Sequence, residues 1–339
     1  MKFRPRLLAF VPAIIGFALF IYVINRTGLP EIWVRVNSLG AGFLLILAVS
    51  SIRYLSRSFA WMRCMAPDDR KIGFWSLWRA RVAGEAIGDL TFGPVIAEPM
   101  KLVALGDRVS LTSRISSLAV ENIAYTISCF MMIMAGSIAL LATFSLNESL
   151  ISALIIALGV VTVSTVAATL IISRRWRPVS VIAAKIAIVL PGRLADLVRH
   201  LRSLEDYIFN FYTNRPVNFL LLVLCQVVFH LAGIVEIFAT MRMIGVKLTF
   251  ATAFMLESFN RAVNIIFIFV PALVGVDEAG TGLVTGALGF GAASGVALAI
   301  IRKIRMFFWI GVGLLFLLGD RTKPVITVEA GVKDRTNIR

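Results

Sequence analysis

Histidine and cysteine are scarce in this chain: two histidines and three cysteines occur among 339 residues. Cys64, Cys129 and Cys225 lie far apart, in or beside apolar stretches, which is typical of small buried side chains and not of a disulfide framework. His200 and His230 are also isolated, so the sequence has no ligand spacing for a metal. We therefore expect no metal site, no cofactor and no catalytic centre built on histidine or cysteine.

Charged residues are also few, at 16% of the chain, whereas 59% of the residues are hydrophobic and the mean hydropathy is +0.89. Several apolar stretches reach about 18 residues or more, the length that crosses the hydrocarbon core of a bilayer. The alternating segments of about ten residues that form outer-membrane barrels are missing. The sequence therefore predicts an all-α polytopic membrane protein.

Acidic residues are outnumbered, since 34 Lys and Arg face 19 Asp and Glu and the net charge is +15. In a soluble protein this excess would favour nucleic-acid binding. Here no basic soluble segment stands apart from the apolar stretches, so we expect no nucleic-acid partner. In membrane proteins, Lys and Arg mark the cytoplasmic side and contact anionic lipid.

Six stretches predict transmembrane helices: 7–24, 41–64, 113–144, 150–172, 217–240 and 292–318. The first resembles a signal peptide, but its length and the lack of a small-residue cleavage site favour an uncleaved span. Two further segments, 73–104 and 250–291, are apolar but interrupted by charge, proline and glycine, which predicts broken or re-entrant helices.

Two other segments predict helices at the membrane surface. Residues 178–216 place apolar side chains at helical spacing with charges on the other faces, so we expect amphipathic helices that lie on the membrane or pack as a cytoplasmic cap. The stretch "LPEIWVRV" at 29–36 predicts a short interfacial helix, and residues 320–339 form a polar tail.

The distribution of basic residues predicts the orientation. With the N-terminus inside, the cytoplasmic segments hold 19 Lys and Arg and the outer loops hold four, so both termini are expected in the cytoplasm. Two halves, 1–148 and 149–319, then share the order span, span, broken segment, span. Because each half crosses three times, the second enters from the opposite face, as in an inverted-topology repeat.

Charges inside the membrane segments have two interpretations. Each costs about 2.5 to 3.5 kcal/mol at the bilayer centre on insertion scales. Arg81 and Glu85 are four residues apart, as are Glu257 and Arg261, so each pair meets on one helix face. Such pairs neutralise each other and hold a bundle together, or they line a polar cavity, where irregular backbone is tolerated at membrane depth.

The cavity hypothesis predicts a set of substrate-binding or cavity-lining residues: Glu85, Glu98, Lys101, Glu121, Glu257, Arg261, Asn264, Asp277, Glu278, Arg302 and Arg305. Pro94, Pro271 and Gly275 are expected to break the two segments, with Gly275 forming the turn before the paired acids.

The stretch "VPALVGVDEAG", followed by a span with Arg302 and Arg305, resembles a signature of the flippase-like family related to the lysylphosphatidylglycerol synthase transmembrane region. "TFGPVIAEPMK" is similar to a Pro–Gly-rich–Glu-Pro motif of that family, and Glu121 to a further family acid. Because Glu278 matches both the internal repeat and the signature, we expect it to matter more than Asp277. The resemblance covers most of the chain.

The chain departs from the family pattern at three places. Ala272–Leu273 and Ile96–Ala97 stand where the family has glycine pairs, and Asn122 stands where it has Arg. These departures bear on the substrate more than on the fold. The motifs with Glu98 and Glu121 look closer to the stand-alone subgroup associated with hopanoid-producing bacteria.

The resemblance implies a flippase of the bacterial inner (cytoplasmic) membrane and not an enzyme. Its implied partners are membrane lipids, whether anionic or aminoacylated phospholipid, polyprenyl or hopanoid lipid, and a homo-oligomer is compatible with it. No aminoacyl-transferase domain follows the last span, so we expect translocation without lipid charging. Two alternatives stay open: an intramembrane lipid transferase that uses paired carboxylates as acid and base, and a structural membrane partner.

Overall fold

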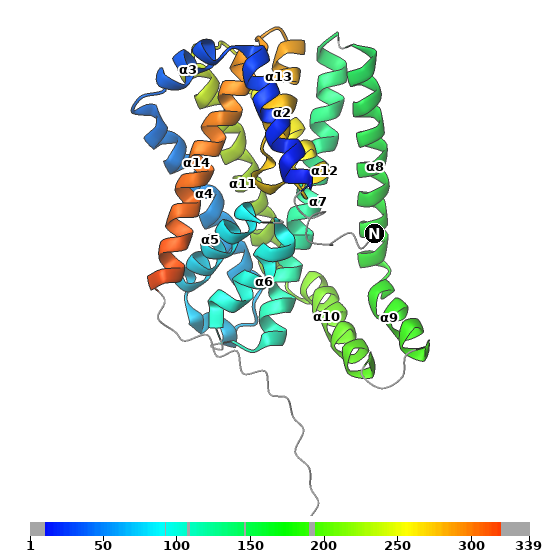
Figure 1. Cartoon of the computed structure of the whole chain (residues 1–339). Helices are drawn as coiled ribbons and strands as arrows, with labels where there is room; N and C mark the ends of the chain where they lie inside the picture. Colours follow the sequence, from blue (N-terminus) through cyan, green and yellow to red (C-terminus); the bar gives the residue numbers. More distant parts are fainter. Residues whose placement is uncertain (1–10, 92, 107–108, 146, 190–193, 320–339) are drawn as a thin grey trace, which may run out of the picture.

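The computed structural model describes residues 11–91, 93–106, 109–145, 147–189 and 194–319, and the described residues contain helices but no strand (Figure 1). The start of the first predicted span and the predicted tail, 320–339, lie outside them. The α-helices are α2 (Val11–Thr27), α3 (Leu29–Asn37), α4 (Gly42–Cys64), α5 (Phe74–Leu90), α6 (Pro94–Leu105), α7 (Leu111–Thr143), α8 (Glu148–Ser173), α9 (Pro178–Val189), α10 (Leu194–Asn214), α11 (Pro216–Met243), α12 (Phe250–Ile266), α13 (Val276–Ala287) and α14 (Ala292–Gly319).

Within these residues, four helices are long and apolar enough to cross a membrane: α4, α7, α8 and α11. The helix α14 has 28 residues but carries three basic side chains, and 17 residues of α2 are described. The protein is therefore an all-helical polytopic membrane protein, as the composition predicts. The count of six spans and the cytoplasmic position of both termini stay predictions.

Local side-chain chemistry sets where several helices begin. Ser110 accepts a hydrogen bond from the Ser113 amide at the start of α7, and Thr249 accepts one from the Thr252 amide at the start of α12. These caps satisfy amides that have no partner inside the helix. Pro94 opens α6, where its missing N–H and fixed φ are no cost.

The two segments predicted to be broken are helical hairpins. The first pairs α5 with α6, and the second pairs α12 with α13 through the 3₁₀ turn η3 (Pro271–Leu273). In Figure 1 the first hairpin occupies the lower half of the bundle and the second the upper half. Each packs against a helix from the other half of the chain, α5 on α14 and α12 on α7, while α4 and α11 pair between them.

The turn in the second hairpin contains an unusual backbone. Ala272 and Leu273 both adopt φ of 51°, in the left-handed region, and Gly275 follows with φ of 82°. Glycine adopts this region freely, whereas an L-residue there brings its Cβ close to the following carbonyl oxygen. Ala272 and Leu273 therefore occupy positions where the backbone favours glycine, the residue that the resemblance implies there.

Substituting Ala272 by Gly is expected to stabilise the protein. Relief of the left-handed strain is worth about 1 kcal/mol in the free energy of unfolding. The matched control is Ala279→Gly, because Ala279 lies inside α13, where glycine costs about 0.5 to 1 kcal/mol. Thermal unfolding in detergent compares the two variants. If Ala272→Gly lowers the melting temperature as Ala279→Gly does, the turn is not strained.

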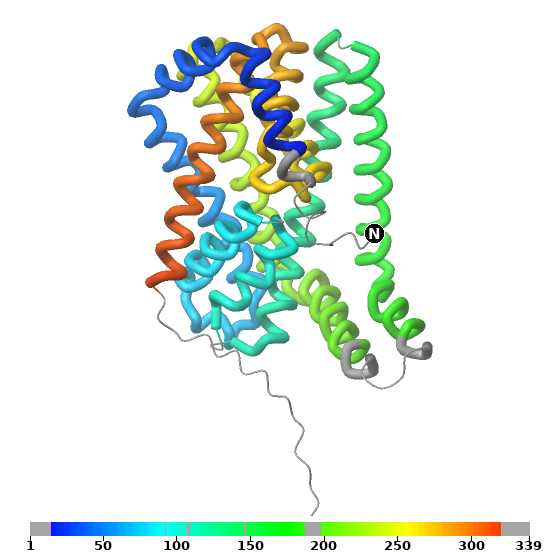
Figure 2. Tube along the Cα trace, in the orientation of Figure 1, coloured from blue at the N-terminus to red at the C-terminus, as the bar shows by residue number. Residues whose placement is uncertain are grey.

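The segment 178–216 forms two helices with different roles. The helix α10 docks under the bundle, where the Tyr207 hydroxyl donates to the Cys64 carbonyl at 2.6 Å and Phe211 packs against Leu222. The helix α9 packs on α10, and together with α8 it stands at one side of the molecule (Figure 2). The predicted cap is therefore α10, while α9 exposes apolar residues such as Val179 and Ile182.

Candidate functional site

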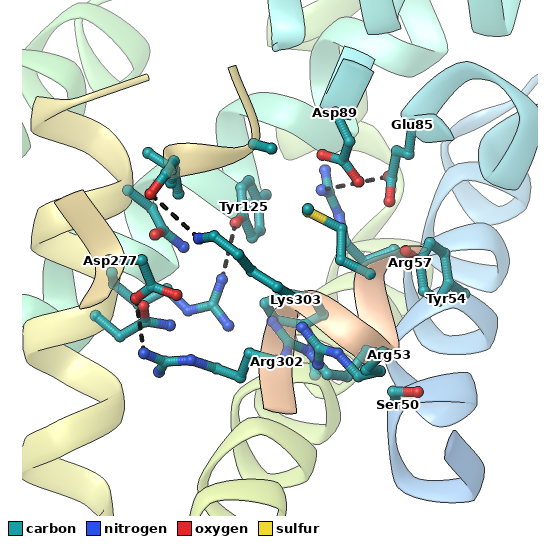
Figure 3. Close-up of a pocket in the computed structure, with 18 of the residues that line it drawn as sticks. Ser50, Arg53, Tyr54, Arg57, Glu85, Asp89, Tyr125, Asp277, Arg302 and Lys303 are labelled. Carbon is teal, nitrogen blue, oxygen red and sulfur yellow. Dashed lines mark hydrogen bonds and ion pairs between the residues drawn. The ribbon is translucent and has the colours of Figure 1, made fainter. Parts of the chain in front are cut away.

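A cavity of about 240 Å³ lies where the two hairpins meet the central helices α4 and α14 (Figure 3). Its wall is mostly polar and charged, although it lies within an apolar bundle. The lining residues are Ser50, Arg53, Tyr54, Arg57, Arg81, Glu85, Asp89, Tyr125, Phe229, Asn260, Arg261, Asn264, Ala272, Leu273, Asp277, Arg302, Lys303, Arg305 and Met306.

Glu121, on α7, is the centre of one buried charge cluster and is 0% exposed. Arg57 donates to its two carboxylate oxygens at 2.8 and 2.9 Å, and Arg81 donates at 2.9 Å. Arg81 also pairs with Glu85 at 3.2 Å on its own helix, so the predicted i,i+4 pair is present. The bidentate contact with Glu121 holds the Arg57 guanidinium in place on the cavity wall.

Lys101 connects the first hairpin to this cluster from α6. Its ammonium lies 2.9 Å from Glu98 and 3.3 Å from Glu85. The other Glu98 oxygen accepts a hydrogen bond from the Asn122 amide at 2.8 Å. Asn122 thus makes a polar contact with the first hairpin but brings no charge.

A second cluster forms around Glu236 and Glu257. Arg53 lies 3.3 Å from Glu236 and 3.9 Å from Glu257, so α4 is joined to α11 and α12 through one side chain. Arg305 forms a close ion pair with Glu236, and Arg261 forms one with Glu257. The second predicted i,i+4 pair, Glu257 with Arg261, is therefore also present.

The adjacent acids Asp277 and Glu278 have different surroundings. Asp277 lines the cavity and accepts from Arg302 at 2.7 Å. Glu278 is 0% exposed and lies off the wall, where it accepts from the Gly275 amide at 2.8 Å and lies 3.0 Å from Lys303. Asp277 therefore faces the cavity, whereas Glu278 closes the turn and pairs with Lys303, and the greater importance of Glu278 stays a prediction.

Aromatic rings hold three of the guanidinium groups. Arg57 lies 3.8 Å above the Tyr125 ring, and Arg53 and Arg261 lie 4.7 and 5.0 Å from the Phe229 ring centre. Stacking on a ring face stabilises a cation and limits its motion. Each of these three guanidinium groups is therefore held between a carboxylate and an aromatic ring.

Six of the predicted site residues lie on the wall: Glu85, Arg261, Asn264, Asp277, Arg302 and Arg305. The other five lie behind it, each in an ion pair with the network: Glu98, Lys101, Glu121, Glu257 and Glu278. The predicted breaks lie at helix starts, with Pro94 opening α6, Pro271 opening η3 and Gly275 preceding α13.

Sequence reasoning left out Arg53, Arg57, Tyr54, Asp89 and Lys303, all of which line the cavity. Arg53 and Arg57 had a readable signal, since two arginines one helical turn apart are rare in an apolar span. Asp89 is the exception on this wall, because among the described residues no basic group lies within ion-pair distance of it. Tyr54 carries no comparable signal.

The described residues of the cavity do not form a metal site. Among the described residues, no group of three His, Cys, Asp or Glu side chains is arranged to hold a metal ion, and all three cysteines are free. The arrangement instead offers guanidinium and ammonium donors, paired carboxylates and a few amide and hydroxyl groups.

Comparison with known families shows which family the chain resembles over its length. The family model for the lysylphosphatidylglycerol synthase TM region matches residues 8–314, which is nearly the whole chain. Comparisons with curated proteins and with solved structures give no match.

Proposed function

Because the chain belongs to the lysylphosphatidylglycerol synthase TM-region family, we propose that it is a flippase that moves a polar-headgroup lipid between leaflets. The observation that carries this proposal is the charged cavity inside an apolar helical bundle. Its volume of about 240 Å³ lies below the range of roughly 300 to 1,000 Å³ for sites that enclose drug-sized ligands. The headgroup would enter the cavity while the hydrocarbon part stays in the bilayer.

The exchange of helices between the two halves supports an inverted repeat around this cavity. The hairpin α5–α6 packs on α14, and α12 of the other hairpin packs on α7. In transporters built from inverted repeats, the two repeats move against each other and expose one site to each side in turn. We propose the same movement between residues 1–148 and 149–319, with α4 and α11 at the centre.

Paired charges stabilise the polar cavity inside the apolar bundle. Seven basic residues line the wall and Lys101 lies behind it, which makes eight basic residues. The acidic residues also number eight. Three line the wall, and five lie behind it: Glu98, Glu121, Glu236, Glu257 and Glu278. Buried charges are tolerated when they are paired and hydrogen-bonded. A headgroup would exchange some of these contacts for its own.

A reconstitution experiment tests the flippase proposal. The purified protein is placed in liposomes with a lipid labelled on its acyl chain, and an impermeant reductant reports how fast the label reaches the outer leaflet. We expect faster exchange than in protein-free liposomes for at least one headgroup class. Equal rates with and without protein, across anionic, zwitterionic and cationic headgroups, would contradict the proposal.

The cavity supports the transferase alternative less well. Acid and base catalysis needs a carboxyl group free to exchange a proton with the substrate. Glu85 and Asp277 on the wall are each ion-paired, which leaves Asp89. Lipid profiles of a deletion strain separate the two functions, because loss of an enzyme removes a lipid species, whereas loss of a flippase leaves the lipid in one leaflet.

A further inference from the structure

The cavity wall is not balanced in charge. Seven basic side chains line it, but only three acidic ones do: Glu85, Asp89 and Asp277. The acids that neutralise Arg57, Arg305 and Arg261 lie behind those side chains and are at most 2% exposed. Each of these ion pairs therefore directs its positive end into the cavity, and the nearest charges to a bound group are mostly cationic.

Arg302 has donors to spare on this wall. One of its terminal nitrogens, Nη2, donates to Asp277 at 2.7 Å and to the Thr281 hydroxyl at 2.6 Å. The side chain is only 8% exposed, and its Nε and Nη1 have no hydrogen-bond partner in the part of the chain that the structure describes. A buried donor that makes no hydrogen bond costs free energy, so an acceptor oxygen that comes within reach of these nitrogens would be stabilised.

A cationic group would find few acceptors in the same cavity. Glu85 is shared by Arg81 and Lys101, and Asp277 is paired with Arg302. Asp89 is the remaining acid on the wall, and it lies on α5, at the other end of the cavity from Arg302 (Figure 3). A ligand in the cavity would therefore meet one carboxylate without an ion-pair partner, that of Asp89, and several guanidinium groups that face the cavity.

We infer that the cavity accepts a headgroup with net negative charge, a phosphate ester that carries no compensating ammonium, and that Arg302 is its principal contact. The planar guanidinium fork matches two phosphate oxygens, and hydrogen bonds between ions are shorter and stronger than those between neutral groups. Arg305 and Lys303 line the same wall and add positive charge. The inference rests on the proposed flippase function.

Transport of lipids from three headgroup classes, anionic, zwitterionic and cationic, separates the inference from the proposed function. Lipids with the same labelled acyl chains carry phosphate or phosphoglycerol, phosphoethanolamine, or lysyl-phosphoglycerol headgroups. We expect the anionic lipids to exchange about tenfold faster than the other two. Equal rates, or the fastest exchange for the cationic lipid, would overturn the inference and leave a flippase. If no lipid is moved, the flippase proposal fails, and the binding measurement below then tests whether the cavity prefers an anionic headgroup.

Binding is measured by native mass spectrometry of the full chain, purified from an equal mixture of phosphatidylglycerol and phosphatidylethanolamine. The wild-type protein should retain about tenfold more of the anionic lipid. Asp277→Asn with Arg302→Gln removes both charges together, so neither residue is left as a lone buried ion, and the double variant should abolish the preference. Arg242→Gln, on the exposed end of α11, is the matched control and should keep it. No preference in the wild type, or an unchanged preference in the double variant, would refute the inference.

Discussion

Replacing Glu121 by Gln is expected to destabilise the protein strongly. Two guanidinium groups, of Arg57 and Arg81, donate to this carboxylate at 2.8 to 2.9 Å, and Glu121 and Arg81 are fully buried. Glutamine has nearly the same shape but no charge, so it leaves both guanidinium groups short of a counter-ion. Breaking a buried ion pair from one side costs about 3 to 5 kcal/mol, a large share of the stability of most proteins.

The matched control is Glu31→Gln in α3. Glu31 also pairs with an arginine, Arg35 at 3.2 Å, but its side chain is 55% exposed. Exposed ion pairs contribute about 0 to 1 kcal/mol because water and salt screen them. Both variants are compared by expression level, by elution as a single species in detergent and by thermal unfolding. A Glu121→Gln protein with the melting temperature of Glu31→Gln would mean that the cluster does not hold the bundle together.

Helix positions were the most predictable part of the fold. The predicted spans 41–64, 150–172 and 217–240 differ from α4, α8 and α11 by at most three residues at either end. Apolar length determines these helices, since a stretch of about 20 apolar residues is stable in a bilayer only as a helix. The span predicted at 113–144 begins two residues earlier, because the Ser110 side chain caps α7.

The two broken segments were predicted as interruptions, but their form was not. Charge together with Pro94 and Pro271 indicated a break in each. That each break is the turn of a hairpin depends on contacts between distant elements, α5 with α14 and α12 with α7. The left-handed backbone at Ala272 and Leu273 could not be predicted, because those residue types favour right-handed conformations and the surrounding packing overrides them.

Local ion pairs of the site were predictable and distant ones were not. Arg81 with Glu85, and Glu257 with Arg261, follow from the helical repeat alone. The contact of Arg57 with Glu121 joins residues 64 apart in the sequence, and that of Arg53 with Glu236 joins residues 183 apart. The partners of Arg53 and Arg57 depend on how α4 packs between α7 and α11. No local sequence pattern predicts that packing.

The pair Asp277 and Glu278 shows why a motif match does not identify the residue that meets a substrate. Neighbouring residues on a helix point about 100° apart, and of this pair one side chain, Asp277, faces the cavity. Which one does so depends on the rotation of α13, and the turn at Gly275 sets that rotation. There Glu278 binds the backbone amide of Gly275, and Asp277 is left facing Arg302.

Replacing Gly275 by Ala should therefore destabilise the protein and disturb the cavity together. An added Cβ would overlap the Gly16 carbonyl oxygen of α2 and would lie 2.8 Å from the Phe20 amide nitrogen. These are backbone atoms, so no side chain can rotate away, and the φ of 82° is itself unfavourable for alanine. Strain of about 1 to 2 kcal/mol and overpacking of about 1 to 3 kcal/mol add to a loss of roughly 2 to 5 kcal/mol.

The control for this substitution is Gly159→Ala in α8, where nothing lies within 4 Å of the added Cβ. There alanine should leave the melting temperature unchanged or raise it, since glycine weakens a helix by about 0.5 to 1 kcal/mol. If Gly275→Ala folds with normal stability but loses lipid exchange, the turn acts through the orientation of Asp277 and Arg302. If it keeps both stability and exchange, α2 and α13 can separate without consequence, and the close contact at Gly275 does not define the cavity wall.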